Sequence, residues 1–96
     1  MCVMSEESAI YVGRKPVMSY VLAVIRAFND LGAEAVTLKA RGRAISKAVD
    51  VAELSRRSFL EDVEVSGIEI GSEQVSTPEG GSRGVSTIAI TLRKKA

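Results

Sequence analysis

Residues 39–50, KARGRAISKAVD, lie where a strand pattern becomes a helix pattern. Up to Ala40 apolar and polar residues alternate, and from Ala44 onward apolar residues recur at helical spacing. Four of the chain's thirteen basic residues fall inside this stretch: Lys39, Arg41, Arg43 and Lys47. A helix N-terminus offers free N–H groups and partial positive charge, so basic residues at such a junction favour a phosphate-binding surface.

The segment before this junction predicts a strand–helix–strand unit. A helix is predicted over residues 16–31. Its apolar residues fall on one helical stripe: Val17, Tyr20, Val21, Val24, Ile25, Phe28 and Leu31. Pro16 suits the first turn, and Gly32 suits a left-handed C-terminal cap. Short strands are predicted at residues 9–12 and 36–40. The connection is short enough to join parallel, neighbouring strands.

The segment after the junction predicts a second helix and two strands. The helix covers residues 44–59, with a stripe of Ile45, Ala48, Val49, Ala52 and Phe59. In the strand over residues 63–70 the alternation slips at Ser66-Gly67, as a β-bulge requires. The last strand covers residues 88–93. The glycine-rich residues 72–85 between them are interpreted as the mobile tip of a long antiparallel hairpin.

These elements predict an α/β two-layer sandwich with the order β-α-β-α-β-β. Its mixed four-stranded sheet carries two helices on one face, and the last two strands form a long hairpin arm. Ninety-six residues with 46% apolar content fit one compact domain. We expect that domain to cover residues 8–95, after a disordered N-terminus at residues 1–7.

The formal net charge of +1 results from cancellation between blocks of the chain. Residues 13–47 and 83–95 are rich in bases, whereas residues 50–79 are rich in acids. Segregated charge of this kind builds a local field that attracts a polyanion even when the total charge is small. The composition is therefore compatible with a nucleic-acid ligand.

The sequence offers little that supports catalysis. It contains no histidine, and the one cysteine, Cys2, cannot form an internal disulfide. No serine has a plausible base beside it, and the acids between residues 69 and 79 lack the spacing of an oxygen-ligand metal site. We expect no enzyme activity, no metal and no cofactor.

No apolar run approaches the roughly 20 residues that a membrane span needs. The N-terminus also lacks the basic-then-apolar order of a signal peptide. We expect a cytoplasmic protein with no membrane partner.

Two groups of basic residues occupy equivalent loops. Arg14 and Lys15 follow the first predicted strand, and the Arg41-Gly42-Arg43 turn follows the second. If those strands are parallel, both loops and both helix N-termini emerge at one edge of the sheet. Gly42 would let the backbone approach a phosphate closely, and Lys47 would extend the surface. The alternative interpretation is that these are ordinary solvated loop charges.

Two further residues have a structural and a functional interpretation. Arg83, in the predicted hairpin tip, is either a solubility residue or an arm that enters a minor groove. Tyr20 is either a core residue of the first helix or an aromatic that stacks on a base.

Residues 13–21, 39–50 and 85–88 resemble the Alba family of archaeal chromatin proteins, and the similarity covers residues 8–95. The KARGRAISKAVD run is specific to that family. The resemblance implies the fold just described and a homodimer, or a heterodimer with a paralogue, that assembles further on DNA. It also implies sequence-independent binding of double-stranded DNA and of RNA, and association with the chromosome in the nucleoid.

The resemblance also implies roles for single residues. The two basic loops contact the nucleic-acid backbone, and the hairpin with Arg83 reaches along a groove. Tyr20 matches an RNA-contact position, and Phe59 matches an aromatic that packs between adjacent dimers on DNA.

The sequence departs from the family pattern at two places. Family members commonly carry two lysines after the glycine, and acetylation of the first weakens DNA binding. Arg14 occupies that position here, which leaves Lys15 as the candidate acetylation site in this loop. Residues 60–62 replace a frequent proline, which affects the packing between dimers.

The leading hypothesis is a small chromatin protein that coats and compacts DNA as a dimer. The alternative is an RNA-binding subunit of an RNA-processing ribonucleoprotein, or an RNA chaperone, because the same surface would serve A-form helices. An enzyme acting on nucleic acid is the least favoured class.

Overall fold

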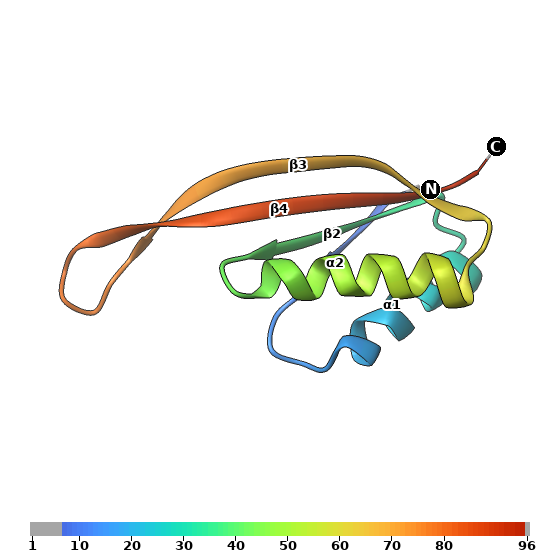
Figure 1. Ribbon diagram of the computed structural model, residues 1–96, viewed down its shortest axis with the longest axis horizontal. Coiled ribbons are helices and arrows are strands. Elements are labelled where there is room, and N and C mark those ends of the chain that lie inside the picture. The colour runs from blue at the N-terminus through green and yellow to red at the C-terminus, as the bar shows by residue number, and fades with distance from the viewer. Residues whose placement is uncertain (1–6, 96) are drawn as a thin grey trace.

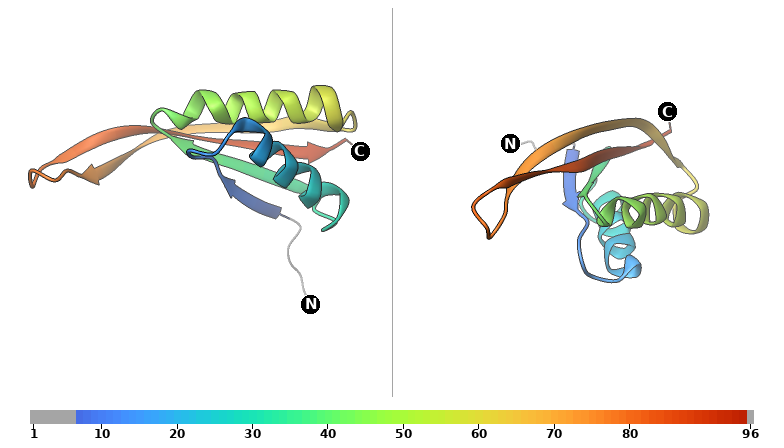
Figure 2. Two further views of the ribbon diagram at one scale, coloured as in Figure 1. Left: turned by 90° about the horizontal axis from the view of Figure 1, so that it is seen from below. Right: turned by 60° about the vertical axis from the view of Figure 1, so that its left-hand side comes forward.

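The computed structural model describes residues 7–95 as a four-stranded sheet with two helices against one face (Figures 1 and 2). The predicted β-α-β-α-β-β order and two-layer architecture are confirmed. The elements are β1 (Glu7–Tyr11), α1 (Val17–Asn29), β2 (Ala35–Arg41), α2 (Ala44–Leu54), the π-helical turn η1 (Ser55–Phe59), β3 (Val63–Ser76) and β4 (Ser82–Lys94). The expectation of disorder at residues 1–7 lies outside the described residues except at Glu7, which begins β1.

The strand order across the sheet is β1-β2-β4-β3. β1 and β2 are parallel neighbours, as predicted, with Tyr11 paired to Lys39. β4 is antiparallel to both β2 and β3, and the register of the β3–β4 ladder shifts between Val65 and Gly67. The predicted bulge is therefore confirmed. Because β1 and β2 run in the same direction, the loops that follow them leave the sheet at the same edge.

The core lies between the sheet and the helices. Its largest fully buried side chains include Val21, Val24 and Phe28 of α1, together with Leu38 and Leu92 from the two central strands. They follow from the apolar helical stripe and from the alternation along the strands.

α1 ends earlier than predicted, and Leu31 is exposed. The backbone of Gly32 has a φ of 71°, a left-handed conformation that turns the chain out of the helix. Leu31 therefore lies beyond the last helical turn and not on the buried stripe, so its assignment to that stripe was wrong. Pro16 precedes the helix as its N-cap, with extended backbone.

The buried stripe of α2 differs from the predicted one. Ala48, Val51, Ala52 and Ser55 are buried, whereas Val49 and Phe59 are exposed. Over η1 the hydrogen bond runs from the N–H of Leu60 to the carbonyl of Ser55, at 2.8 Å. This wider turn rotates Phe59 away from the core and brings Leu60 onto it. The prediction that one regular helix covers residues 44–59, with Phe59 on its apolar stripe, was therefore wrong.

The hairpin of β3 and β4 is more regular than the composition suggested. Paired strand continues to Ser76 and resumes at Ser82, so most of residues 72–85 is ladder and only residues 77–81 form the turn. Gly80, with a φ of 94°, donates its N–H to the carbonyl of Thr77 at 3.0 Å. The arm extends past the helix layer (Figure 1). The helices cover neither face of the arm there. Neither face therefore needs apolar side chains, and the sequence shows no apolar–polar alternation that would predict a strand.

Candidate nucleic-acid interface

The structure brings the two predicted basic loops together. The N–H of Val12 donates to the carbonyl of Lys39 at 2.8 Å, so the chain leaves β1 beside β2. The ammonium group of Lys47, on α2, donates to the main-chain oxygens of Gly13 and Lys15 at 3.0 and 2.8 Å. A side chain that follows the second loop thus holds the first loop. We call Arg14, Lys15, Arg41, Arg43 and Lys47 the two-loop surface.

Tyr20 supports the first loop from below. Its phenol oxygen accepts hydrogen bonds from the N–H groups of Gly13 and Lys15, at 2.8 and 3.1 Å. The residue is only 9% exposed. Burial acts to raise the pKa of the phenol, but the N–H donors of Lys15 and Gly13 and the charges of Lys47 and Lys15 outweigh it, so the pKa is lowered. This placement assigns Tyr20 a positioning role, and its contact with RNA stays a prediction.

Arg41 is the last residue of β2 and points toward β3. Its guanidinium group lies 3.1 Å from the carboxylate of Glu73, and both side chains are largely exposed. An exposed pair of this kind contributes about 0–1 kcal/mol, so a phosphate can compete for Arg41. Arg43, also exposed, is the N-cap residue of α2.

Gly42 fits the tight turn between these two arginines. Its φ of 60° is strained for other residues, and its N–H donates to the carbonyl of Ser86 at 2.9 Å. A Cβ atom here would lie 3.5 Å from a methyl group of Val85. Gly42 therefore sets the turn against β4.

Both helices begin at this edge, and in their first turns the N–H groups of Ser19 and Ile45 are bonded to the carbonyls of Pro16 and Gly42. Within the described residues, neither Pro16 nor Arg43 makes a side-chain cap hydrogen bond, and neither first turn carries an acidic residue. The N–H groups there and the positive ends of the helix dipoles add to the basic side chains. The arrangement suits phosphate oxygens.

Arg83 lies in β4, paired with Val75, and is exposed. It lies two residues after the five-residue turn, at the outer end of the hairpin as predicted, but on a paired strand and not in an irregular loop. The β3–β4 arm that carries this end of β4 extends beyond the helices (Figure 1). The structure therefore does not bring Arg83 together with the basic loops.

Phe59 lies at the end of η1 with 49% of its surface exposed. Close by in sequence, Glu53 accepts hydrogen bonds from Arg56 and Arg57, the shortest in each case being 2.8 Å. The hydrogen bonds from Arg56 and then Arg57 lower the pKa of Glu53. The sequence analysis did not predict these two salt bridges, although the i, i+3 and i, i+4 spacing of the three residues on a helix indicates them.

Sequence reasoning also missed an apolar surface formed by α2 and the hairpin. Ile70 pairs with Ile88 and Ile68 with Ile90, on the helix side of the sheet, but α2 does not cover Ile68 and Ile70. A hollow of about 500 Å³ lies among Ile45, Ile70 and Ile88. We call Ile45, Val49, Ile68, Ile70 and Ile88 the apolar hairpin surface. The sequence contained a signal for this surface. Residues 68 and 70 are apolar, but they lie on an outer strand of a four-stranded sheet, which is wider than the area that two helices cover.

Within residues 7–95 no helix is long and apolar enough to cross a membrane. In the same part of the chain, histidine, cysteine and acidic side chains form no group that could hold a metal ion.

The fold defines the class: a small two-layer α/β protein with parallel first strands, a long hairpin arm and two basic loops at one sheet edge. The family model described as Alba matches residues 8–72, and the chain belongs to the Alba family.

The chain is similar to named members of that family. It is 56% identical over 89 residues to DNA/RNA-binding protein Alba 1 of Archaeoglobus fulgidus, covering 93% of this chain and 98% of the relative. It is 52% identical over 91 residues to DNA/RNA-binding protein Alba of Methanocella arvoryzae, covering 95% and 94%. Among solved structures, Alba from Thermoplasma volcanium matches with a TM-score of 0.84 at 46% identity, covering 90% of this chain and 99% of that one.

Proposed function

We propose that this chain is a chromatin protein that binds double-stranded DNA through its backbone, coats and compacts it as a dimer, and also binds RNA. The observation that carries the proposal is the joining of the two basic loops by Lys47. Their arginines and lysines lie with two uncapped helix N-termini at one edge. Membership of the Alba family supports the proposal, and relatives bear the name DNA/RNA-binding protein.

The chemistry of this surface favours binding without sequence preference. Guanidinium groups, ammonium groups and backbone N–H groups are suited to phosphate oxygens, and phosphate contacts fix position without reporting the base. In this proposal Arg14, Lys15, Arg41 and Arg43 contact the backbone directly, while Tyr20 and Lys47 hold the loop from behind. Binding is the whole activity, and no chemical reaction is assigned.

The hairpin arm supplies the second contact. It reaches beyond the helices and carries Arg83 on an exposed strand. Narrow minor grooves concentrate negative potential and attract arginine. We therefore propose that the arm follows a groove while the two-loop surface holds the backbone.

A second copy of the chain is the proposed occupant of the apolar hairpin surface. Ile70 is 82% exposed, and Ile68 and Val49 are also exposed. A contiguous patch of this kind is characteristic of a protein–protein interface, and a two-fold dimer buries the same patch on both copies. A paralogue with the same patch would give a heterodimer.

RNA is the alternative principal ligand, as in a subunit of an RNA-processing ribonucleoprotein or an RNA chaperone. The names of the relatives include both DNA and RNA. Crosslinking in cells, followed by a count of bound DNA against bound RNA, separates these. If the protein is cytoplasmic and associated with the chromosome, the crosslinked nucleic acid should be mainly genomic DNA.

The double variant Arg41→Ala and Arg43→Ala tests the two-loop surface. We expect weaker binding to every duplex alike, and a slope of log K against log salt that is flatter by about 0.9 for each phosphate that the variant no longer neutralises. Equal affinity and slope would place the binding surface elsewhere.

Arg56→Ala with Arg57→Ala provides the matched control. It removes the same charge at the other end of α2, beside Glu53. Short duplexes that hold one dimer should bind this variant as they bind the unmodified protein. Equal losses in both double variants would indicate a response to net charge alone.

A further inference from the structure

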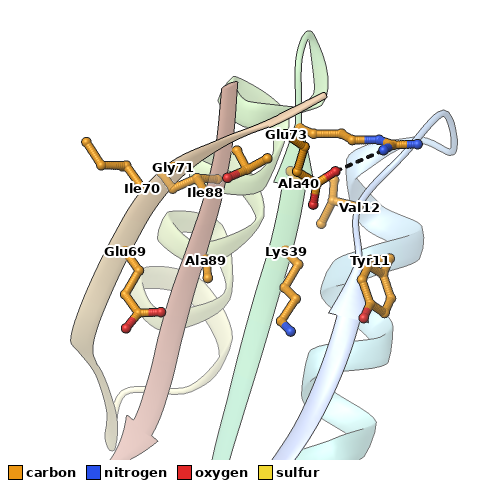
Figure 3. Close-up of a pocket in the computed structure, with 12 residues that line it drawn as sticks. Tyr11, Val12, Lys39, Ala40, Glu69, Ile70, Gly71, Glu73, Ile88 and Ala89 are labelled. Carbon is orange, nitrogen blue, oxygen red and sulfur yellow. Dashed lines mark hydrogen bonds and ion pairs between the residues drawn. The ribbon is translucent and has the colours of Figure 1, made fainter. Parts of the chain in front are cut away.

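The face of the sheet opposite the helices carries a row of side chains that crosses all four strands. Tyr11 of β1 pairs with Lys39 of β2, Lys39 with Ala89 of β4, and Ala89 with Glu69 of β3. Paired residues point to the same side of a sheet. Figure 3 shows all four on this open face, with Tyr11 and Lys39 on one side and Glu69 on the other.

Small residues make the floor of a hollow on this face. Ala89 separates Lys39 from Glu69, and Gly71 has no side chain, so a hollow of about 590 Å³ remains between the two sides. That volume falls in the range of small-molecule sites, roughly 300–1,000 Å³. Tyr11 and Glu69 are three strand spacings apart, or about 14 Å between backbones at about 4.8 Å each.

The chemistry of the two sides differs. Tyr11 is 71% exposed, and the ammonium group of Lys39 lies 5.8 Å from the centre of its ring. An exposed aromatic on an open sheet is a platform on which an unpaired base stacks. Glu69 offers two carboxylate oxygens, which are acceptors only. Among the bases, guanine presents two adjacent donors, a ring N–H and an exocyclic amine.

The hollow is continuous with the two-loop surface. Arg41 is one of its lining residues and reaches across to Glu73 at 3.1 Å. Figure 3 shows Glu73, the acidic partner of this ion pair, at the end of the hollow nearest the loops. The phosphate of a nucleotide whose base stacks on Tyr11 would therefore lie near two cations, Lys39 beside Tyr11 and Arg41 at the end of the hollow.

We propose that this open face binds one unpaired nucleotide of a single-stranded nucleic acid, with guanine as the preferred base. The base stacks on Tyr11, its two donors face Glu69, and its phosphate lies toward Lys39 and Arg41. The site shares Arg41 with the two-loop surface, and to that extent the inference rests on the proposed function. Tyr11 and Glu69 belong to the open face alone.

Short uridine oligomers with guanosine, adenosine, cytidine or uridine at the centre test the site. We expect the guanosine oligomer to bind most tightly. Tyr11→Leu should weaken it at least about fivefold by loss of stacking, whereas Tyr11→Phe, which keeps the ring, should retain the affinity. Duplex DNA should bind both variants as it binds the unmodified protein. Equal affinity for the four oligomers, or equal loss of duplex and oligomer in Tyr11→Leu, would overturn the proposal.

Glu69→Gln tests the recognition of the base. The amide keeps the size of the side chain but replaces one acceptor with a donor, so the ratio of guanosine to adenosine affinity should fall toward one. Glu61→Gln, in the turn before β3, removes the same charge and should leave the ratio unchanged. A guanosine preference that survives Glu69→Gln would contradict the assigned role. Loss of duplex binding in Arg41→Ala with Arg43→Ala tests the two-loop surface separately, because neither Tyr11 nor Glu69 is altered.

Discussion

The ammonium group of Lys47 lies 2.8 Å from the main-chain oxygen of Lys15, so a side chain of α2 holds the loop that follows β1. The same group reaches the main-chain oxygen of Gly13 at 3.0 Å. The charge of Lys47 is therefore engaged in the protein, while the side chain of Lys15 is exposed to solvent. The two lysines have different roles, although both lie in one basic surface.

Lys47→Met should weaken duplex binding by about 1 kcal/mol or more, because the variant loses charge-assisted hydrogen bonds that order the loop. The amide resonances of residues 13–15 should shift and broaden in the free protein. Lys94→Met, an exposed lysine at the end of β4, removes the same charge and should leave those amides unchanged. Undisturbed loop amides in Lys47→Met would mean that Lys47 does not position the loop.

Lys15→Gln, which mimics acetylation, should change duplex affinity by no more than about 1 kcal/mol, the value of one phosphate contact at moderate salt. Arg14 keeps its charge under any acetyltransferase. The loop also stays in place, since Lys47 and Tyr20 bind main-chain atoms of residue 15 and not its side chain. Titration of one labelled duplex against both proteins measures this. A loss above about 2 kcal/mol would restore a switch at Lys15.

The order of elements and the convergence of the loops were predictable from the sequence, because both depend on local periodicity and on the parallel pairing of β1 with β2. The position of Phe59 was not. One π-helical turn exchanges Phe59 for Leu60 on the core side, and nothing in the local pattern signals it. The open face was missed for a different reason. Tyr11 and Glu69 are far apart in sequence, and only the strand order β1-β2-β4-β3 aligns them in one row.

Ile70→Glu should convert the proposed dimer to a monomer, because it places a charge in the apolar hairpin surface. Ile70 is exposed in the single chain, so the fold should survive, as circular dichroism can verify. Sedimentation velocity gives the mass. Leu22→Glu, an exposed apolar residue on α1, is the matched control and should leave the mass unchanged. A dimeric Ile70→Glu protein would move the interface to another surface.

Phe59→Ala should leave the free energy of unfolding nearly unchanged and reduce the cooperativity of binding along long DNA. The side chain is half exposed, so the loss should be well below the roughly 3–5 kcal/mol typical of a buried phenylalanine. Urea denaturation and a binding isotherm measure the two effects. Leu31→Ala, also an exposed apolar residue, should alter neither. A large loss of stability in Phe59→Ala would place the residue in an interface within the dimer.

Tyr20→Phe should lower the free energy of unfolding by about 1 kcal/mol, since the N–H groups of Gly13 and Lys15 lose their acceptor. The difference between the two proteins should also depend on pH. The pKa of Tyr20 in the folded state is lowered from its ordinary value of 10.0, because hydrogen bonds from Lys15 and Gly13 and nearby lysine charges outweigh burial. The folded state therefore binds fewer protons than the unfolded state between these two pKa values, and stability must rise with pH in that window.

The unmodified protein should have a larger free energy of unfolding than Tyr20→Phe. We expect this difference to be constant at neutral pH and to grow as the pH rises toward 10.0. Tyr11 is present in both proteins, so its ionisation cancels in the difference. Urea denaturation at a series of pH values measures the free energies. An advantage that shrinks as the pH rises would show that the phenolate is disfavoured in the folded state, and that burial outweighs the two N–H donors at this loop.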